Sequence, residues 1–467
     1  MPITSRHPQY ELQLTRWRTN RDAVAGQDAI HRAGELHLPD DNNSYNKDRE
    51  AINRYKRYLA RATWTPITSY TKEGLIGAVF RKSGVSELPE KIAYMNENVD
   101  GAGNSLEQFS KHVLGELLEV GRVGILTEYP RAEDGLSQAQ VFELGLRPKL
   151  TTYKAEDIDN WRYKFVNGKL QLVMVKLVEQ AEVTRDLFSS DLETRYRVLR
   201  IEEETGNYIQ ELYDEHENLL EQITPRQFNG NTWKYIPFQF VGASNNLPDV
   251  DVAPLSGIAD LNIAHYQVTA DKRKNLHIHS GGLLVISTNM SSEEFALANP
   301  NGVTVGADSG LFLGDSGSAQ LLQLDASSQS HTEIESLERQ LIAVGARLIT
   351  KGGQAQTAEA ARIDASAESS ALSNVVGNAS EGIEAALESA CLFAGAEQDN
   401  VTYMLNMDFF DNKLNPQDVM ALIQLGDRGL IAMRDQREML RRSGLISHDR
   451  TDEEIDAEID IQSVSGL

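Results

Sequence analysis

Residues 254–279 read PLSGIADLNIAHYQVTADKRKNLHIH and keep a helical pattern from Ser256 to about His279. At the standard helical rise this segment spans about 36 Å. Its apolar residues fall on two faces: Leu255, Ile258 and Leu261 on one, and Ile263, Tyr266 and Ala270 on the other. A helix that is apolar on two faces is packed on both of them. We therefore expect this helix to lie between two other parts of the protein.

A second helix is expected over residues 332–349, which read TEIESLERQLIAVGARLI. Its apolar residues recur at steps of three and four: Ile334, Leu337, Leu341, Val344 and Leu348. This spacing is typical of a helix that packs at a shallow angle on a partner. The natural partner is the helix over 256–279, although an ordinary helical hairpin in one core would give the same pattern.

The segment between these helices, residues 280–330, is rich in Gly, Ser and Asn. Two short strands are expected in it, at Leu283–Ile286 and Leu311–Leu313, and we interpret the segment as an external docking module. After the second helix come a polar loop, Lys351-Gly-Gly-Gln-Ala-Gln356, and an Ala- and Ser-rich helix over 357–393.

The N-terminal half predicts a mixture of helices and strands. Ser105 and Gln108 form a capping box at the start of an amphipathic helix, and Gly121 is a plausible left-handed residue at its end. A strand follows over 123–129, and several runs of alternating apolar and polar residues in 150–241 indicate antiparallel strands. The fold class is therefore α+β, and residues 245–254 are expected to be a linker.

Beyond residue 400 the expected elements are shorter. Val401–Phe410 alternates like a strand, and Asn415-Pro416 is typical of a helix start. Gly426 and Gly444 are expected to end helices. The strongly acidic residues from Asp449 onward predict a loosely ordered tail.

Residues 49–61 predict a basic helix in which two tyrosines, Tyr55 and Tyr58, lie among the cations. The basic residues are Arg49, Arg54, Lys56, Arg57 and Arg61. Basic residues with interleaved aromatics are typical of a nucleic-acid contact. A helix that faces solvent or a neighbouring subunit has the same composition, and we favour that interpretation.

The composition is that of an ordinary non-membrane protein of 467 residues, with a net charge of -24 and a pI near 4.9. Tight DNA binding through phosphates normally needs a basic protein, so a repressor or polymerase is disfavoured. A protein past which DNA slides is not disfavoured, because acidic walls repel phosphates. No apolar run is long enough to cross a membrane, and the N-terminus has no apolar signal core.

Motifs for catalysis or cofactor binding are not found. No glycine cluster precedes a Gly-Lys-Ser/Thr triplet, which disfavours ATP hydrolysis. His277 and His279 could offer two imidazoles from a strand, but no further ligand stands at a diagnostic spacing. The single cysteine, Cys391, fits a buried helix residue. We expect no enzyme activity, no cofactor and no metal site.

Several blocks of sequence, taken in order, resemble tailed-bacteriophage portal proteins, in particular a portal-like family of otherwise uncharacterised phage proteins. The blocks are residues 98–109 (NVDGAGNSLEQF), 120–126 (VGRVGIL), 153–161 (YKAEDIDNW), 254–267 (PLSGIADLNIAHYQ), 357–366 (TAEAARIDAS) and 369–376 (SSALSNVV). The order and spacing of the set carry the resemblance, which covers most of residues 60–445.

The resemblance implies a portal fold with wing, stem, clip and crown, built around long stem and tunnel helices. The wing would be residues 1–250 with the strand 401–411, and the stem helices would be 254–279 and 331–349. The clip would be 280–330, the tunnel loop 350–357, the tunnel helix 358–396, and the crown with its acidic tail 412–467. Because the chain is short for a portal, we expect the crown to be a helical hairpin.

The resemblance also implies a ring of about twelve copies at the capsid vertex of a virion, assembled in the host cytoplasm. Double-stranded DNA would pass through the ring without tight binding. The implied partners are the terminase motor, capsid protein, scaffold and head–tail adaptor. The residues expected to face DNA are Lys351, Gly352, Gly353, Gln354 and Gln356 of the tunnel loop, and Lys272, Arg273 and Lys274 of the first stem helix.

Three consecutive helical residues span about 200°, so Lys272, Arg273 and Lys274 do not all face one tunnel. Salt bridges to acidic neighbours in the ring explain them equally well. Two other functions stay open: another ring-forming head–tail connector component, and a soluble enzyme whose site has no recognisable motif.

Overall fold

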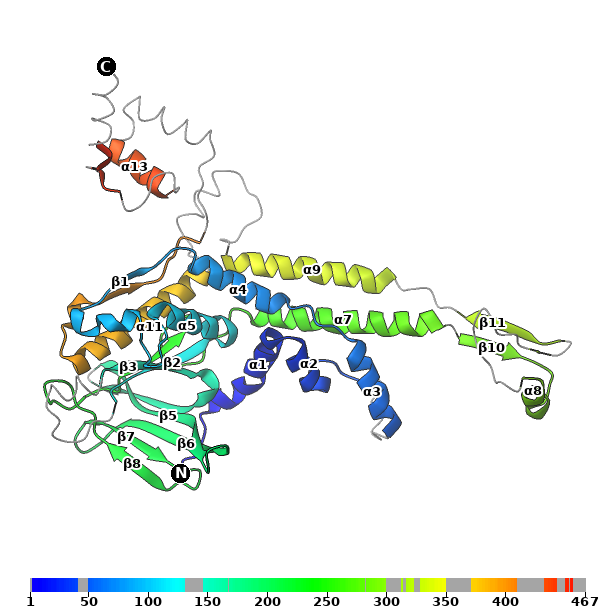
Figure 1. The fold of residues 1–467 in the computed structure, drawn as a ribbon, viewed down its shortest axis with the longest axis horizontal. Coiled ribbons are helices and arrows are strands. Elements are labelled where there is room, and N and C mark those ends of the chain that lie inside the picture. The colour runs from blue at the N-terminus through cyan, green and yellow to red at the C-terminus, as the bar shows by residue number, and fades with distance from the viewer. Residues whose placement is uncertain are drawn as a thin grey trace, which may run out of the picture. The chain divides into compact units, whose positions relative to one another are not determined.

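The computed structural model describes residues 2–40, 49–130, 146–166, 168–281, 283–299, 312–313, 316–322, 328–349, 371–409, 432–442, 450–452 and 454–456. The chain divides into two compact units. The first comprises residues 1–77 and 84–405, and the second comprises residues 78–83 and 406–467. Figure 1 labels the elements along the chain. None of the described helices is both long and apolar enough to cross a membrane.

The first unit is a mixture of helices and antiparallel sheets, so the expected α+β class is confirmed. Its longer helices are α1 (Pro8–Ala25), α2 (Gln27–Ala33), α3 (Arg49–Arg61), α4 (Ile67–Val79), α5 (Leu106–Val120), α7 (Ser256–Gly281), α8 (Ser292–Ala298), α9 (Ser328–Ile349) and α11 (Ala371–Ala394). Short 3-10 helices lie at Gly34–Leu36, Glu90–Asn96, Ala155–Asp157 and Gln398–Asn400.

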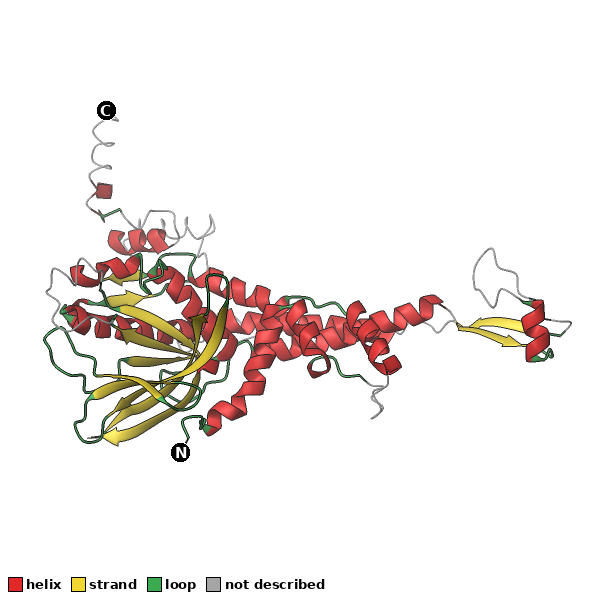
Figure 2. Cartoon of the chain, turned by 60° about the horizontal axis from the view of Figure 1, so that its bottom comes forward, coloured by secondary structure: helices red, strands yellow, loops and turns green. Residues whose placement is uncertain are grey.

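The larger sheet is a five-stranded antiparallel meander in the order β4-β5-β6-β7-β8 (Figure 2). Its strands are β4 (Ile158–Val166), β5 (Lys169–Thr184), β6 (Ser190–Ile201), β7 (Tyr208–Tyr213) and β8 (Leu219–Ile223). Gly168, with φ of 77°, lies in the turn that joins β4 to β5. The alternating residues of the sequence therefore form the antiparallel strands that we expected.

A second, three-stranded sheet has the order β3-β2-β9 and is also antiparallel. It contains β2 (Arg122–Glu128), β3 (Lys149–Lys154) and β9 (Phe238–Gly242). Helices α5 and α11 pack on it. An aromatic core with the buried side chains of Trp17, Trp161 and Trp233 joins α1 to both sheets.

Helix α5 confirms both predicted caps. The Ser105 hydroxyl accepts from the Gln108 amide, and the Gln108 side chain accepts from the Ser105 amide. Gly121 has φ of 79°, and a Cβ atom there would lie 2.7 Å from the carbonyl oxygen of Asp251. A larger residue would therefore be strained and would displace the chain that leads into α7.

Two small sheets complete the first unit. Strand β1 (Val85–Glu87) pairs with β12 (Thr402–Met404), and β10 (Leu283–Ser287) pairs with β11 (Ser318–Leu322). The strand predicted at Leu283–Ile286 is confirmed. The strand predicted at Leu311–Leu313 is wrong for Phe312 and Leu313, which are not in a strand, and Leu311 lies outside the described residues.

Three other expectations need correction. The strand expected over Val401–Phe410 extends only over Thr402–Met404 within the described residues. The helix expected from residue 332 begins four residues earlier, at Ser328. The tail expected to be loosely ordered instead includes helical residues at 452 and 454–456.

In the second unit, α13 (Met433–Arg442) is held to this part of the tail by ion pairs. Arg441 pairs with Asp452 and Arg437 pairs with Asp456. Asp452 and Asp456 therefore neutralise two cations of α13. The features expected at Asn415-Pro416, Gly426 and Gly444 lie outside the described residues.

Candidate functional site

Helix α7 lies between two groups of helices, as its two apolar faces predict (Figure 1). On one side it packs along α9, where Leu337 and Leu341 are buried. Ile334 and Val344 of the predicted seam are half-buried. On the other side, Tyr266 and Ala270 are buried in a cluster formed with α1, α2 and the residues around α3.

The first turns of α7 are tied to the rest of the unit by buried amides. The Asn262 side chain accepts from the Thr68 amide at 3.1 Å and from its hydroxyl at 2.9 Å, and donates to the Thr65 carbonyl at 3.0 Å. The Asn20 amide donates to the Ser256 hydroxyl at 3.0 Å and to the Glu119 carbonyl at 2.9 Å. These bonds fix the position and direction of α7.

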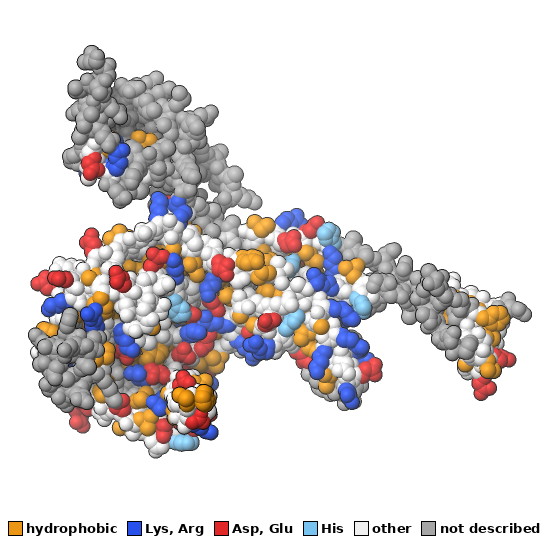
Figure 3. Space-filling model, in the orientation of Figure 1, with side chains coloured by type: hydrophobic (Ala, Val, Ile, Leu, Met, Phe, Trp, Pro, Cys, Tyr) orange, Lys and Arg blue, Asp and Glu red, His pale blue; other side chains and the backbone are white. Residues whose placement is uncertain are grey.

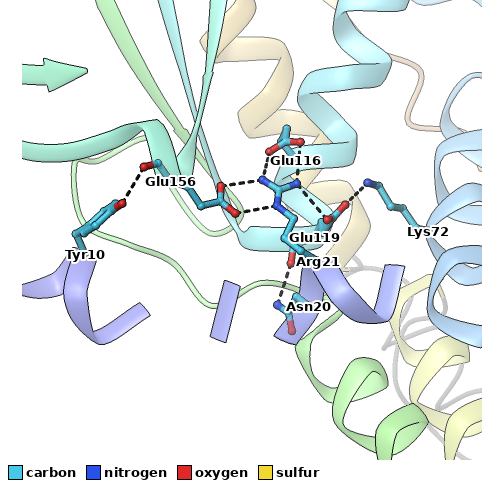
Figure 4. A network of polar contacts seen from close by, with 7 residues as sticks. All are labelled: Tyr10, Asn20, Arg21, Lys72, Glu116, Glu119 and Glu156. Carbon is cyan, nitrogen blue, oxygen red and sulfur yellow. Dashed lines mark hydrogen bonds and ion pairs between the residues drawn. The ribbon is translucent and has the colours of Figure 1, made fainter. Parts of the chain in front are cut away.

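Beside this anchor is a network of charged side chains around Arg21 (Figure 4). The Arg21 guanidinium contacts Glu116 at 2.5 Å, Glu119 at 3.1 Å and Glu156 at 2.8 Å. Lys72 adds a second cation on Glu119. The network joins α1, α4, α5 and the 3-10 helix at Ala155–Asp157.

The network controls the charge states of its members. Burial alone would raise the pKa of Glu116, but the hydrogen bonds and charge of Arg21 outweigh it, so the pKa lies below its ordinary value. Burial likewise opposes the charge on Arg21, but hydrogen bonds to Glu156 and Glu116 raise its pKa above the ordinary value. Both groups are ionised at neutral pH, and the network is structural.

A groove between α3 and the last turns of α7 is the candidate interaction site. Its volume is about 330 Å³. Basic side chains line it, namely Arg54, Arg57, Arg61 and Lys274 with His277, together with Tyr55, Tyr58 and Asp40. Figure 3 shows Lys and Arg side chains gathered over this part of the surface. The predicted basic helix at 49–61 is confirmed and forms one wall.

The structure brings two of the predicted stem residues to this groove. Arg273 donates to the Thr63 hydroxyl and to the Arg61 carbonyl, the latter at 3.5 Å. The Lys274 ammonium lies 4.8 Å from the ring centre of Tyr58. Tyr58 in turn donates to Asp271 at 2.6 Å. Lys272, Arg273 and Lys274 are consecutive residues of α7, so at 100° per residue the three cations do not share one face.

The tunnel-loop residues Lys351, Gly352, Gly353, Gln354 and Gln356 lie outside the described residues. His277 is in α7 rather than in a strand, which corrects the expectation for the His277–His279 pair. Within the described ranges, no group of three His, Cys, Asp or Glu side chains is placed to hold a metal ion.

Cys391 is a buried residue of α11, as expected. Burial raises the pKa of its thiol to about 11, so the thiol is protonated at neutral pH and is a poor nucleophile.

Arg122 is a buried cation that the sequence did not single out. Its guanidinium lies 3.9 Å from the ring centre of Trp161 and 4.3 Å from that of Phe240. Its three nitrogens have no hydrogen-bond partner within the described part of the chain. Burial lowers its pKa to about 9, so it still carries a charge at neutral pH. The sequence feature that could have indicated this buried cation is the single arginine within the otherwise apolar run 120–126, VGRVGIL.

The small module that follows α7 exposes apolar side chains. Leu297 of α8 is 82% exposed and Phe312 is 60% exposed. A capping box between Ser291 and Glu294 starts α8. In Figure 1 the described strands and helix of this module lie beyond the end of α7 and away from the two larger sheets, which fits an exposed element more than a core element.

Comparison with known proteins gives one family match. Residues 254–394 match the family described as Domain of unknown function (DUF4055). The matched range begins at Pro254, just before α7, and ends with α11. It covers less than a third of the chain. No curated protein matches the chain.

Among solved structures, similar chains come from particles of a gene transfer agent (GTA). The neck of an empty GTA particle computed with C6 symmetry matches at 13% identity, with a TM-score of 0.40, covering 84% of this chain and 94% of that one. The neck of a native particle computed with C12 symmetry gives the same identity and score, covering 84% and 93%.

A virion of the native particle matches at 11% identity and a TM-score of 0.40, covering 89% of this chain and 98% of that one. At these scores the similarity does not establish a shared fold, and no role is carried over from these chains.

Proposed function

We propose that this chain is a portal protein: a structural subunit that forms a ring at one capsid vertex, through which double-stranded DNA enters and leaves. The observation that carries the proposal is the path of the chain along α7, through the exposed β10–α8–β11 module, and back along α9. Helix α11 follows the pair. This is the order of stem, clip, stem and tunnel helix that the sequence blocks imply.

Two properties of the chain support this function. The net charge of -24 suits a wall along which DNA slides, because it opposes tight binding to phosphates. The packing of α7 on two sides, by α9 and by the α1–α3 region, leaves different surfaces on the two flanks of the unit. A ring requires such a difference, since each copy uses one surface for one neighbour and another surface for the next.

The exposed module is the proposed docking site for partners outside the ring. Its apolar side chains, such as Leu297 and Phe312, would contact the terminase motor during packaging and the head–tail adaptor afterwards. Capsid protein and scaffold would contact other surfaces of the ring. In this function the chain has no catalytic role of its own.

Electron microscopy of the purified chain tests the proposal. The expected images are rings with a central opening. A variant in which residues 283–322 are replaced by a short Gly-Ser linker is expected to form the same ring but to lose attachment of the motor and the adaptor. A wild-type chain that stays monomeric and turns over a substrate would contradict the proposal.

A further inference from the structure

Two surfaces of opposite charge lie on opposite sides of α7. Gly257 and His265 face α9, with the Gly257 Cβ position 4.0 Å from Val344 and His265 3.7 Å from Glu338. At 100° per residue, these positions lie on the side of the helix opposite to Tyr266 and Ala270, which pack toward α3. The α3–α7 groove and helix α9 therefore lie on opposite sides of α7.

The groove side is basic, and the cations of α3 make few ion pairs within the described part of the chain. Helix α3 carries five basic residues against one acidic residue, Glu50. Arg54 lies 3.7 Å from Glu50, and both side chains are more than half exposed. Arg57 and Arg61 make no side-chain ion pair among the described residues, and Arg57 is exposed. Such cations are available to acidic groups of a partner.

One exposed flank of α9 carries two carboxylates and one apolar residue, and each carboxylate lies near a single histidine: Glu335 is 3.3 Å from His331 and Glu338 is 3.7 Å from His265 of α7. Glu335, Glu338 and Ile342 follow at steps of three and four, so they share one face of the helix. The side chains of Glu335 and Glu338 are 56% and 54% exposed, and Ile342 is 71% exposed. We name these three residues the α9 stripe.

We propose that the α3–α7 groove of one copy binds the α9 stripe of a second copy. The surfaces have opposite charge, and each carries apolar side chains: Ile342 on the stripe, and the rings of Tyr55 and Tyr58 in the lining of the groove. A phosphate backbone would pair with the arginines but would leave these apolar side chains in water, so a protein partner fits the surfaces better.

The proposed contact joins copies head to tail. Because the groove and the stripe lie on opposite sides of α7, each copy binds one neighbour through its groove and the other through its stripe. Contacts of this kind close into rings when the rotation between copies permits. This contact rests on the proposed function, because it requires that the chain assembles as a ring. In that ring the groove and the α9 stripe would join neighbouring stem helices.

Charge reversal on each surface tests the pairing. The groove variant carries Arg57→Glu and Arg61→Glu, and the stripe variant carries Glu335→Arg and Glu338→Arg. Each is expected to weaken assembly at least about tenfold in the concentration required, as measured by analytical ultracentrifugation. A chain with all four substitutions is expected to regain assembly, because the charges are opposite again. Unchanged circular dichroism and unfolding midpoints confirm that every variant is folded.

A mixture of the two variants gives a more specific signature. Both contacts between unlike copies then join opposite charges: the intact stripe meets the intact groove, and the reversed groove meets the reversed stripe. We expect the mixture to assemble with the two variants alternating, although neither variant assembles alone. The control is the exchange Lys164→Glu with Glu203→Lys, an exposed pair between a residue of β4 and a residue of the turn after β6, which is expected to change nothing.

Four outcomes would overturn the inference. Normal rings from both reversal variants would reject the contact while leaving the proposed ring intact. Failure of the four-substitution chain to regain assembly would reject the pairing. Salt-dependent binding of a short DNA duplex that the groove variant alone loses, with assembly unchanged, would assign the groove to nucleic acid. A wild-type chain that never assembles would reject both the contact and the proposed function.

Discussion

Arg21 and Arg57 belong to helices of the same unit but have opposite environments. Arg21 is 22% exposed and contacts three glutamates from two other segments of the chain. Arg57 is exposed, lines the α3–α7 groove and has no ion pair among the described residues. The difference separates two uses of basic residues in an acidic protein.

Charge that is satisfied inside the chain holds the fold, because removing one partner leaves the others buried without compensation. Charge that is left on the surface contributes little to the stability of one copy, since water and salt screen it. Such charge is available for binding a partner. Substitutions at the two sites should therefore affect different measurements.

The largest effect is expected from Arg21→Ala. Three carboxylates would lose their shared cation, so the free energy of unfolding should fall by about 3–5 kcal/mol. Urea denaturation measures this change. The control is Arg18→Ala, whose side chain is 63% exposed and lies 3.8 Å from Asp22; it should cost less than about 1 kcal/mol. Equal losses in the two variants would contradict the distinction between the two kinds of charge.

Glu116→Gln should lower the free energy of unfolding at neutral pH by about 2 kcal/mol, since Arg21 keeps its other two glutamates. The pH dependence has a definite sign. Because the folded-state pKa of Glu116 lies below its ordinary value of 4.5, its contribution is present above that pH and is lost as the pH falls further. The variant should therefore lose less stability on acidification than the wild type.

Unfolding curves between neutral pH and pH 3 would show this difference. Glu107→Gln is the matched control, because Glu107 is on the same helix but is 57% exposed and pairs with the exposed Lys111. If the free energy of unfolding of Glu116→Gln fell with decreasing pH as steeply as that of the wild type, the network would not control this carboxyl group.

Arg122→Met is expected to raise the free energy of unfolding by about 1 kcal/mol. The substitution removes a charge and three unsatisfied donors from between Trp161 and Phe240, and methionine fills similar space. Arg200→Met is the contrasting control, since Arg200 pairs with Glu211 at 2.7 Å, and it should destabilise. A loss of stability in Arg122→Met would mean that stacking on the two rings outweighs the cost of burying the charge.

The smallest effect on stability is expected at the groove. Arg57→Ala and Arg61→Ala should each change the free energy of unfolding by less than about 0.5 kcal/mol. They should nevertheless weaken self-association. High salt should weaken the self-association of the wild type, so the difference between the wild type and each variant should become smaller. A substantial loss of monomer stability would show that the two arginines hold the fold.

Local signals predicted local structure well. The capping box at Ser105 and the left-handed Gly121 depend on neighbouring residues, so both could be read from the sequence. The seam of α9 and the two faces of α7 follow from periodicity. The partner of β10 could not be predicted in this way, because the strand that pairs with it, 318–322, is less apolar than the segment 311–313.

The candidate site depended on contacts that span the chain. The sequence left the role of the basic helix 49–61 open and gave the cations at 272–274 two alternative roles. Their convergence on one groove joins segments more than 200 residues apart, as the contact between Thr63 and Arg273 shows. The glutamates around Arg21 come from two further segments, and no spacing in the sequence links them to it. Such clusters are set by tertiary packing.

Native mass spectrometry of the purified wild-type chain tests the central claim most directly. The proposed function predicts a closed assembly near twelve copies, which dissociates in the groove variant and reforms in the four-substitution chain. A wild-type chain that stays monomeric at every concentration would contradict the claim that this protein forms a ring.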